Sequence, residues 1–172
     1  MTEQRKRLFT FYVLTILTII SAFTFSYRQF SNTTEPMSWV HATTALARVI
    51  GPEDIILSWW DNGYWLLDQS GGIPYVHNGT HSIQQDRLIA QLYCATSDFD
   101  AYLIATSVSA RYIVLSKRDE NAYPTIKHTA SYTDSKQQTF WYRALQPDFS
   151  SEYFSILYRE KNIVVLETLP HT

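Results

Sequence analysis

Residues 55–65 read IILSWWDNGYW, a short apolar run followed by an aromatic and polar turn. The run Ile55–Leu57 is mostly β-branched and wholly apolar, which is typical of a strand buried on both faces of a sheet. Before it, Gly51 and Pro52 end a helical pattern whose buried face comprises Trp39, Ala42, Leu46 and Val49 and which reaches Ile50. A helix followed by a buried strand predicts a layered α/β domain.

The same alternation of helix and strand continues along the chain. A second buried strand is expected at residues 111–116, lying beside the strand at 55–58. Residues 117–135 are polar, contain Pro124 and predict a long loop or excursion. The chain is expected to end in a β-hairpin. The remaining expected elements are helices over 82–95, 97–109 and 137–145, and hairpin strands at 153–158 and 163–167.

Residues 8–27, LFTFYVLTILTIISAFTFSY, contain no charged side chain. At about 1.5 Å per residue, a helix of this length spans the roughly 30 Å hydrocarbon core of a bilayer. Inside lipid a helix satisfies every backbone hydrogen bond, so we predict one transmembrane helix despite the many β-branched residues. Its membrane-anchor positions include Leu8, Phe11, Leu14, Leu17, Ile20 and Phe23.

Positive charge is concentrated on one side of this run. Arg5, Lys6 and Arg7 precede it, and Arg28 stands nearly alone after it. The positive-inside rule therefore places the tail, residues 1–7, in the cytoplasm and the helix in the cytoplasmic (inner) membrane. A linker over residues 28–36 and a folded domain over 37–172 then lie on the periplasmic or extracytoplasmic side.

A cleaved signal peptide is the alternative interpretation of the N-terminal run. A signal peptide has an apolar core of about 7–15 residues followed by a small-x-small cleavage site. This run is longer, and its best cleavage candidate, Thr24-Phe25-Ser26, is weak. We therefore expect an uncleaved anchor.

The composition of the 172 residues excludes several classes of protein. The formal net charge of −2 argues against a basic surface for nucleic acid. The single cysteine, Cys94, excludes an intrachain disulfide and any CxxC site. The expected partners are therefore the lipid bilayer and other proteins, and no nucleic acid.

The turn after the first strand is the candidate binding site. In an α/β sheet, ligands bind at the carboxyl ends of strands. Trp59 and Trp60 provide apolar walls, ionised Asp61 accepts hydrogen bonds from a hydroxyl or an N–H, and Gly63 allows close backbone approach. The alternative is an aromatic corner of the core, or an aromatic belt at a membrane interface, in which Asp61 caps the next helix.

Residues 58–65, SWWDNGYW, resemble the Trp-Trp-Asp-Tyr-Gly signature of oligosaccharyltransferase catalytic subunits, which transfer lipid-linked glycans to asparagine. The strand at 110–116 and the hairpin over 152–167 also resemble segments of that family. The resemblance covers about residues 37–168 and implies the extracytoplasmic domain of such an enzyme. It further implies that Trp59, Trp60 and Asp61 grip the hydroxyl of the Ser or Thr two places after the acceptor asparagine.

Two departures from the family qualify what the resemblance implies. Asn62 replaces the tyrosine of the signature, and the chain shows one membrane helix without acidic residues instead of a multi-helix catalytic module. Divalent-metal catalysis needs several oxygen ligands at one site. We therefore expect no catalytic residue, no metal site and no cofactor.

Two functions remain open. In the first, the protein is a non-catalytic, single-pass membrane-anchored accessory subunit that docks on a larger, multi-subunit membrane protein complex. In the second, it is the acceptor-peptide-binding component of a split oligosaccharyltransferase or related glycosyltransferase. The missing catalytic module favours the first function, and the retained Trp-Trp-Asp sequence keeps the second open.

The predicted orientation can be tested with a protease site engineered into the linker near Asn32. Because the linker is expected outside the cytoplasm, protease added to intact spheroplasts should cut the chain there. Immunoblotting of both fragments reports the cut. Protection of the site until the membrane is disrupted would reverse the orientation.

Overall fold

The computed structural model describes residues 37–77, 79 and 82–170. All of them lie in the second of two units, residues 36–172, into which the chain divides after Glu35. The predicted tail, transmembrane helix and linker, including Leu8, Phe11, Leu14, Leu17, Ile20 and Phe23, lie outside the described residues. Within the described ranges no helix is both long enough and apolar enough to cross a membrane.

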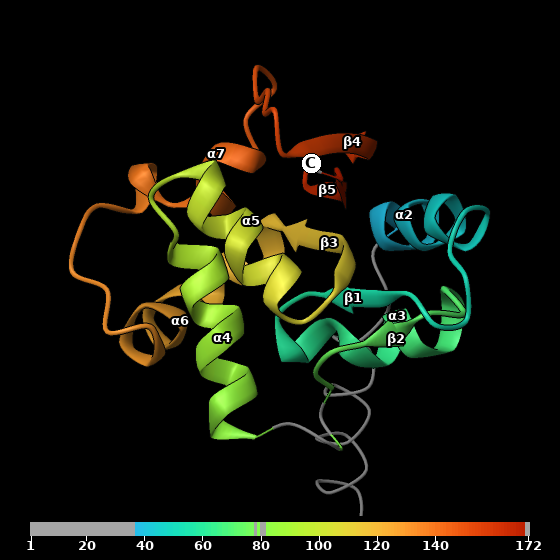
Figure 1. Cartoon of the computed structure of the whole chain (residues 1–172), viewed down its shortest axis with the longest axis horizontal. Helices are drawn as coiled ribbons and strands as arrows, with labels where there is room; N and C mark the ends of the chain where they lie inside the picture. The colour runs from blue at the N-terminus through green and yellow to red at the C-terminus, as the bar shows by residue number, and fades with distance from the viewer. Residues whose placement is uncertain (1–36, 78, 80–81, 171–172) are drawn as a thin grey trace, which may run out of the picture. The chain divides into compact units, whose positions relative to one another are not determined.

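A five-stranded mixed sheet forms the centre of the domain, with the strand order β2-β1-β3-β5-β4 (Figure 1). Strands β2, β1 and β3 are parallel, and β5 and β4 continue the sheet as an antiparallel hairpin. The predicted pairing of the two buried strands and the predicted C-terminal hairpin are both confirmed. The bounds are β1 Ile55–Leu57, β2 Ile73–Pro74, β3 Ala110–Ser116, β4 Phe154–Glu160 and β5 Ile163–Thr168.

Helices cover both faces of the sheet, so the central strands bury side chains on both sides, which accounts for their continuous apolar sequences. Ile113 and Leu115 of β3 point into one core, and Tyr112 and Val114 point into the other. In the first core the sheet packs against α4, α5, α6 and α7, and in the second against α2 and α3 (Figure 1). The bounds are α2 Met37–Ala47, α3 Gly63–Gln69, α4 Ile83–Cys94, α5 Asp98–Ser107, α6 Tyr123–Thr129 and α7 Phe140–Ala144.

Side-chain caps fix the starts of the two helices that follow β2. Ser82 and Gln85 form a capping box at the start of α4. The Oγ of Ser97 accepts a hydrogen bond from the backbone N–H of Asp100 at 3.0 Å, as its spacing predicts. These caps satisfy N–H groups that the first turn of a helix leaves without an internal partner.

The expected first helix is shorter in the structure. Helix α2 ends at Ala47, and Val49, expected on its buried face, is 45% exposed. The backbone N–H groups of Val49 and Ile50 both donate to the carbonyl of Leu46. This tight turn moves Val49 away from the stripe formed by the other apolar residues of the helix.

The prediction of a long loop over residues 117–135 is wrong. The segment contains a 3-10 turn, η2 (Lys117–Asn121), followed by α6, where proline occupies the first turn. Proline costs a helix nothing at this position, and Ile126 anchors α6 in the core. The expected helix over 137–145 divides into a 3-10 turn, η3 (Lys136–Gln138), and the short α7.

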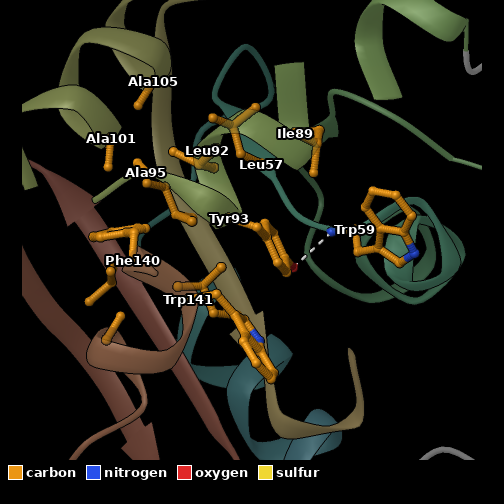
Figure 2. Packing of buried hydrophobic residues seen from close by; sticks show 14 of the residues in the cluster. Leu57, Trp59, Ile89, Leu92, Tyr93, Ala95, Ala101, Ala105, Phe140 and Trp141 are labelled. Carbon is orange, nitrogen blue, oxygen red and sulfur yellow. Dashed lines mark hydrogen bonds between the residues drawn. The ribbon is translucent and has the colours of Figure 1, made fainter. Parts of the chain in front are cut away.

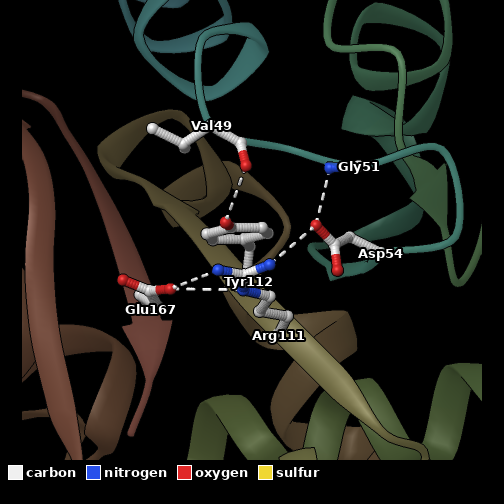
Figure 3. A network of polar contacts seen from close by, with 6 residues as sticks. All are labelled: Val49, Gly51, Asp54, Arg111, Tyr112 and Glu167. Carbon is white, nitrogen blue, oxygen red and sulfur yellow. Dashed lines mark hydrogen bonds and ion pairs between the residues drawn. The ribbon is translucent and has the colours of Figure 1, made fainter.

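A polar network fastens the sheet at the end where β1 and β3 begin (Figure 3). The guanidinium of Arg111 pairs with Asp54 at 3.3 Å and with Glu167 of β5 at 3.1 Å. The same carboxylate of Asp54 accepts the backbone N–H of Gly51 at 2.7 Å. Because Arg111 is exposed, these ion pairs orient the turn before β1 more than they stabilise the fold.

The burial of β1 predicts that the same substitution destabilises the domain much more at Ile56 than at Ile73. Ile56→Asp in β1 places an unpaired charge at a fully buried position and should cost at least about 4 kcal/mol, enough to unfold the domain. The matched control is Ile73→Asp in the adjacent β2, where the side chain is 46% exposed. Thermal melting followed by circular dichroism compares the stability of the two variants. If both variants melt at the same temperature as the wild type, β1 is not a buried strand.

Candidate functional site

The candidate site lies where two parallel strands end. The chain leaves β1 at Leu57, passes through a 3-10 turn, η1 (Trp60–Asn62), and continues directly into α3. Strand β3 pairs with β1 in parallel, so its end at Ser116 lies at the same edge of the sheet. The residues that follow the two strands are therefore brought together.

The first tryptophan of the signature is part of the core. Trp59 is 2% exposed, and its ring centroid lies 6.3 Å from those of both Trp60 and Tyr93. Its backbone N–H donates to the hydroxyl of Tyr93 at 3.0 Å (Figure 2). This bond ties the turn after β1 to helix α4.

A buried carboxylate, that of Asp119, connects the elements around the turn. It accepts hydrogen bonds from the side-chain amide of Asn62 at 2.9 Å, from the hydroxyl of Tyr93 at 2.9 Å and from the backbone N–H of Ser116 at 3.3 Å. Asp119 is 3% exposed. Three donors from η1, α4 and β3 thus converge on one acidic group.

Burial raises the pKa of Asp119 from 3.8 to about 6, although its hydrogen bonds with Asn62, Tyr93 and Ser116 act in the opposite direction. The nearby charge of Asp61 adds to the increase. Tyr93 responds to the same surroundings, since burial and the carboxylate of Asp119 raise the pKa of its phenol well above 10. The phenol therefore stays protonated and donates to Asp119.

The structure explains the asparagine that replaces the tyrosine of the signature. Asn62 is 1% exposed and donates to Ser58 Oγ at 3.2 Å as well as to Asp119. Both hydrogens of its amide are therefore used inside the protein. Asn62 belongs to the frame of the turn.

Gly63 is required by close packing. A Cβ at this position would lie 2.4 Å from the carbonyl oxygen of Val76 and 2.6 Å from the Cα of His77. Backbone atoms cannot move aside as a flexible side chain can, so only glycine lets α3 begin this close to the segment after β2.

Two residues of the signature remain accessible. Asp61 is exposed and Trp60 is half-buried. The hypothesis that Asp61 caps the next helix is wrong, because α3 has Asn62 at its N-cap and no side-chain cap. Partial burial raises the pKa of Asp61, while the charge of Arg118, whose guanidinium lies 4.5 Å from the ring centre of Trp65, lowers it.

The signature therefore has two parts. Trp59, Asn62 and Gly63 form a buried frame with Tyr93 and Asp119, and Trp60 and Asp61 lie on its surface. The sequence patterns predicted no site role for Tyr93 or Asp119. A signal for Asp119 exists, since Ser116 and Asp119 have the spacing of a capping box directly after a buried strand, and they form one. Nothing in the sequence indicates which group the hydroxyl of Tyr93 contacts.

Solved structures show what this arrangement is similar to. The C-terminal globular domain of the oligosaccharyltransferase AglB-S2 from Archaeoglobus fulgidus superposes with a TM-score of 0.66 at 20% identity, covering 80% of this chain and 100% of that one. A second C-terminal globular domain of oligosaccharyltransferase from the same organism gives a TM-score of 0.56 at 19% identity, covering 80% and 99%.

The fold is that of the C-terminal globular domain of oligosaccharyltransferase. The resemblance indicated by the Trp-Trp-Asp segment is thus confirmed for the fold. No protein-family model and no curated protein matches the sequence. At about 20% identity the likeness concerns the path of the chain, and the function has to be argued from the residues of this domain.

The buried carboxyl predicts how stability depends on pH. Because the folded pKa of about 6 exceeds the unfolded value, the native state holds the proton of Asp119 more tightly. This group's contribution to the free energy of unfolding should therefore fall by about 2 kcal/mol as the pH rises from 4 to 6. Urea titrations across this range should show the decrease in the wild type relative to Asp119→Asn, which cannot ionise. If the free energy of unfolding varied with pH in the same way in both proteins, the pKa of Asp119 would not be raised in the folded state.

Proposed function

We propose that the protein is a non-catalytic accessory subunit that docks on a larger membrane protein complex through its folded domain and one transmembrane helix. The observation that carries the proposal is that Trp59, Asn62 and Gly63 of the signature make their contacts inside the domain. Trp59 packs in the core, Asn62 donates to Asp119, and Gly63 contacts the backbone after β2. The signature thereby acts as a structural corner of a domain whose fold accompanies an enzyme in other proteins.

An apolar surface next to this corner suits a protein partner. Tyr64 and Leu67 lie one turn apart on α3 and are 52% and 48% exposed. Exposed apolar groups on one helix face mark contact surfaces, and aromatic residues are enriched in them. We assign the docking contact to this α3 surface, formed by Tyr64 and Leu67.

In this proposal the protein lies in the inner membrane, as the sequence predicts. The run of apolar residues at 8–27 anchors the chain in the inner membrane, and the positive charges at 5–7 keep its N-terminus in the cytoplasm. The domain then faces the periplasmic or extracytoplasmic side. Docking would combine contacts of the transmembrane helix with those of the α3 surface.

Acceptor-peptide binding is a second candidate, and the exposed pair of signature residues favours it. The carboxylate of Asp61 faces solvent on a turn that the buried frame holds in place. An ionised carboxylate accepts a hydrogen bond from the hydroxyl of a Ser or Thr, and half-buried Trp60 beside it would shield that bond. In this alternative Trp59 and Gly63 position the turn, while Trp60 and Asp61 contact the peptide.

The docking proposal predicts different effects for two leucines with equal exposure. Leu67 on α3 and Leu103 on α5 are both 48% exposed. Leu67→Asp should weaken association of the full-length chain with its membrane partner at least about tenfold, because it places a charge in the contact, and Leu103→Asp should not. Native mass spectrometry of gently solubilised complexes measures the partner retained by each variant. Equal retention by both variants would contradict the assigned surface.

Titration of the full-length chain with a Ser/Thr-containing acceptor peptide separates the two functions. The docking proposal predicts no saturable binding. Saturable binding that Asp61→Ala weakens by about 1.5–3 kcal/mol, with unchanged melting, would establish the peptide-binding function instead.

A further inference from the structure

A cleft of about 770 Å³ lies away from the signature, between η2, the η3–α7 segment and the turn of the β4–β5 hairpin. Its volume falls within the range of small-molecule sites. It begins at Lys117, the first residue after β3, and so lies at the edge of the sheet where the parallel strands end. Neither proposed function uses this cleft.

The charged groups that line the cleft have an excess of positive charge. Four cationic side chains face two carboxylates, although the whole chain carries a net charge of −2. The cations are Lys117, Lys136, Arg159 and Lys161, and the carboxylates are Glu120 and Glu160. An excess of one sign in a concave, partly desolvated site concentrates ions of the opposite sign.

Lys136 is the one cation of this group that is neutralised locally. Its ammonium pairs with Glu120 and lies 5.7 Å from the ring centre of Tyr142. The hydrogen bond and the charge of Lys136 lower the pKa of Glu120, so this carboxyl stays ionised. The pair forms a fixed wall of the cleft.

Arg159 carries a charge that no acidic group within ion-pair distance cancels among the described residues. Its Nη2 donates to the carbonyl of Ala144 at 3.1 Å, and its Nη1 donates to the carbonyl of Gln146. These neutral acceptors at the end of α7 hold the guanidinium in place. Partial burial lowers the pKa of Arg159, but a guanidinium remains charged at neutral pH.

Lys117 and Lys161 line the cleft from two backbone segments that lie next to each other. The backbone N–H of Lys117 donates to the carbonyl of Asn162 at 2.8 Å, which places the end of β3 beside the hairpin turn. Both side chains are exposed, and no carboxylate of the described chain lies within ion-pair distance of either ammonium. An anion bound between these two segments would be attracted by both ammonium groups.

We propose that this cleft binds a small phosphate ester, with the phosphate between Lys117 and Lys161 and facing the guanidinium of Arg159. A phosphate with about two negative charges matches several convergent cations better than a single carboxylate does. The cleft is larger than a bare phosphate needs, so it also accommodates the organic part of the ester. A soluble ester and a lipid headgroup offer the same phosphate chemistry.

The test uses the full-length chain in neutral nanodiscs and inorganic pyrophosphate as the probe, with binding measured by calorimetry. We expect saturable binding that weakens as salt increases. Lys117→Gln combined with Lys161→Gln should weaken it at least about tenfold, which corresponds to about 1.4 kcal/mol. The matched control is Arg48→Gln combined with Arg87→Gln, which removes the same charge from exposed positions outside the cleft.

Nanodiscs that contain phosphatidic acid distinguish the two sources of phosphate. If a lipid headgroup reaches the cleft, pyrophosphate binds more weakly in them, and if the ligand is soluble, the affinity is unchanged; either result supports the site. Absence of saturable binding in neutral nanodiscs, or equal weakening by the two double variants, would overturn the proposal. Melting curves of both double variants confirm that each is folded.

Discussion

The carboxylate of Asp119 holds together three elements that are distant in the sequence. Through Asn62 it fixes the turn after β1, through Tyr93 it fixes α4, and through the N–H of Ser116 it fixes the end of β3. Burying an ionised group is costly unless hydrogen bonds compensate it, and this carboxylate accepts three. The position of the Trp-Trp-Asp turn follows from these contacts.

This constraint separates the signature into residues that build the turn and residues that the turn presents. Trp59, Asn62 and Gly63 have their contacts inside the domain, whereas Asp61 faces solvent. A rigid turn with one exposed carboxylate serves a docking surface as well as a peptide site. Docking is favoured by the apolar α3 surface beside it, which is formed by Tyr64 and Leu67.

Much of the fold could be predicted from local patterns. The apolar runs at 55–57 and 111–116 identified the two central strands, and the turn between 158 and 163 identified the hairpin. Helix α6 was missed because one buried residue, Ile126, anchors a short and otherwise polar segment. Periodicity cannot indicate a helix that presents so narrow an apolar face.

The buried half of the site could not be predicted in the same way. Asn62 and Asp119 are 57 positions apart, and neither the aromatic segment nor the polar stretch 117–135 indicates that they meet. Their contact depends on the parallel pairing of β1 with β3, which brings the ends of both strands to one edge of the sheet. The accessible part, Trp60 and Asp61, was identified because its residue types suggest their chemistry directly.

A double-mutant cycle between Asn62 and Asp119 measures whether their hydrogen bond holds the turn in place. The free energies of unfolding of the wild type, Asn62→Ala, Asp119→Ala and the double variant give the coupling energy of the pair. A hydrogen bond from a buried amide to a carboxylate predicts a coupling of about 1.5–3 kcal/mol, so the second substitution should cost much less once the first is present. Additive effects, within about 0.5 kcal/mol, would show that the turn does not depend on this contact.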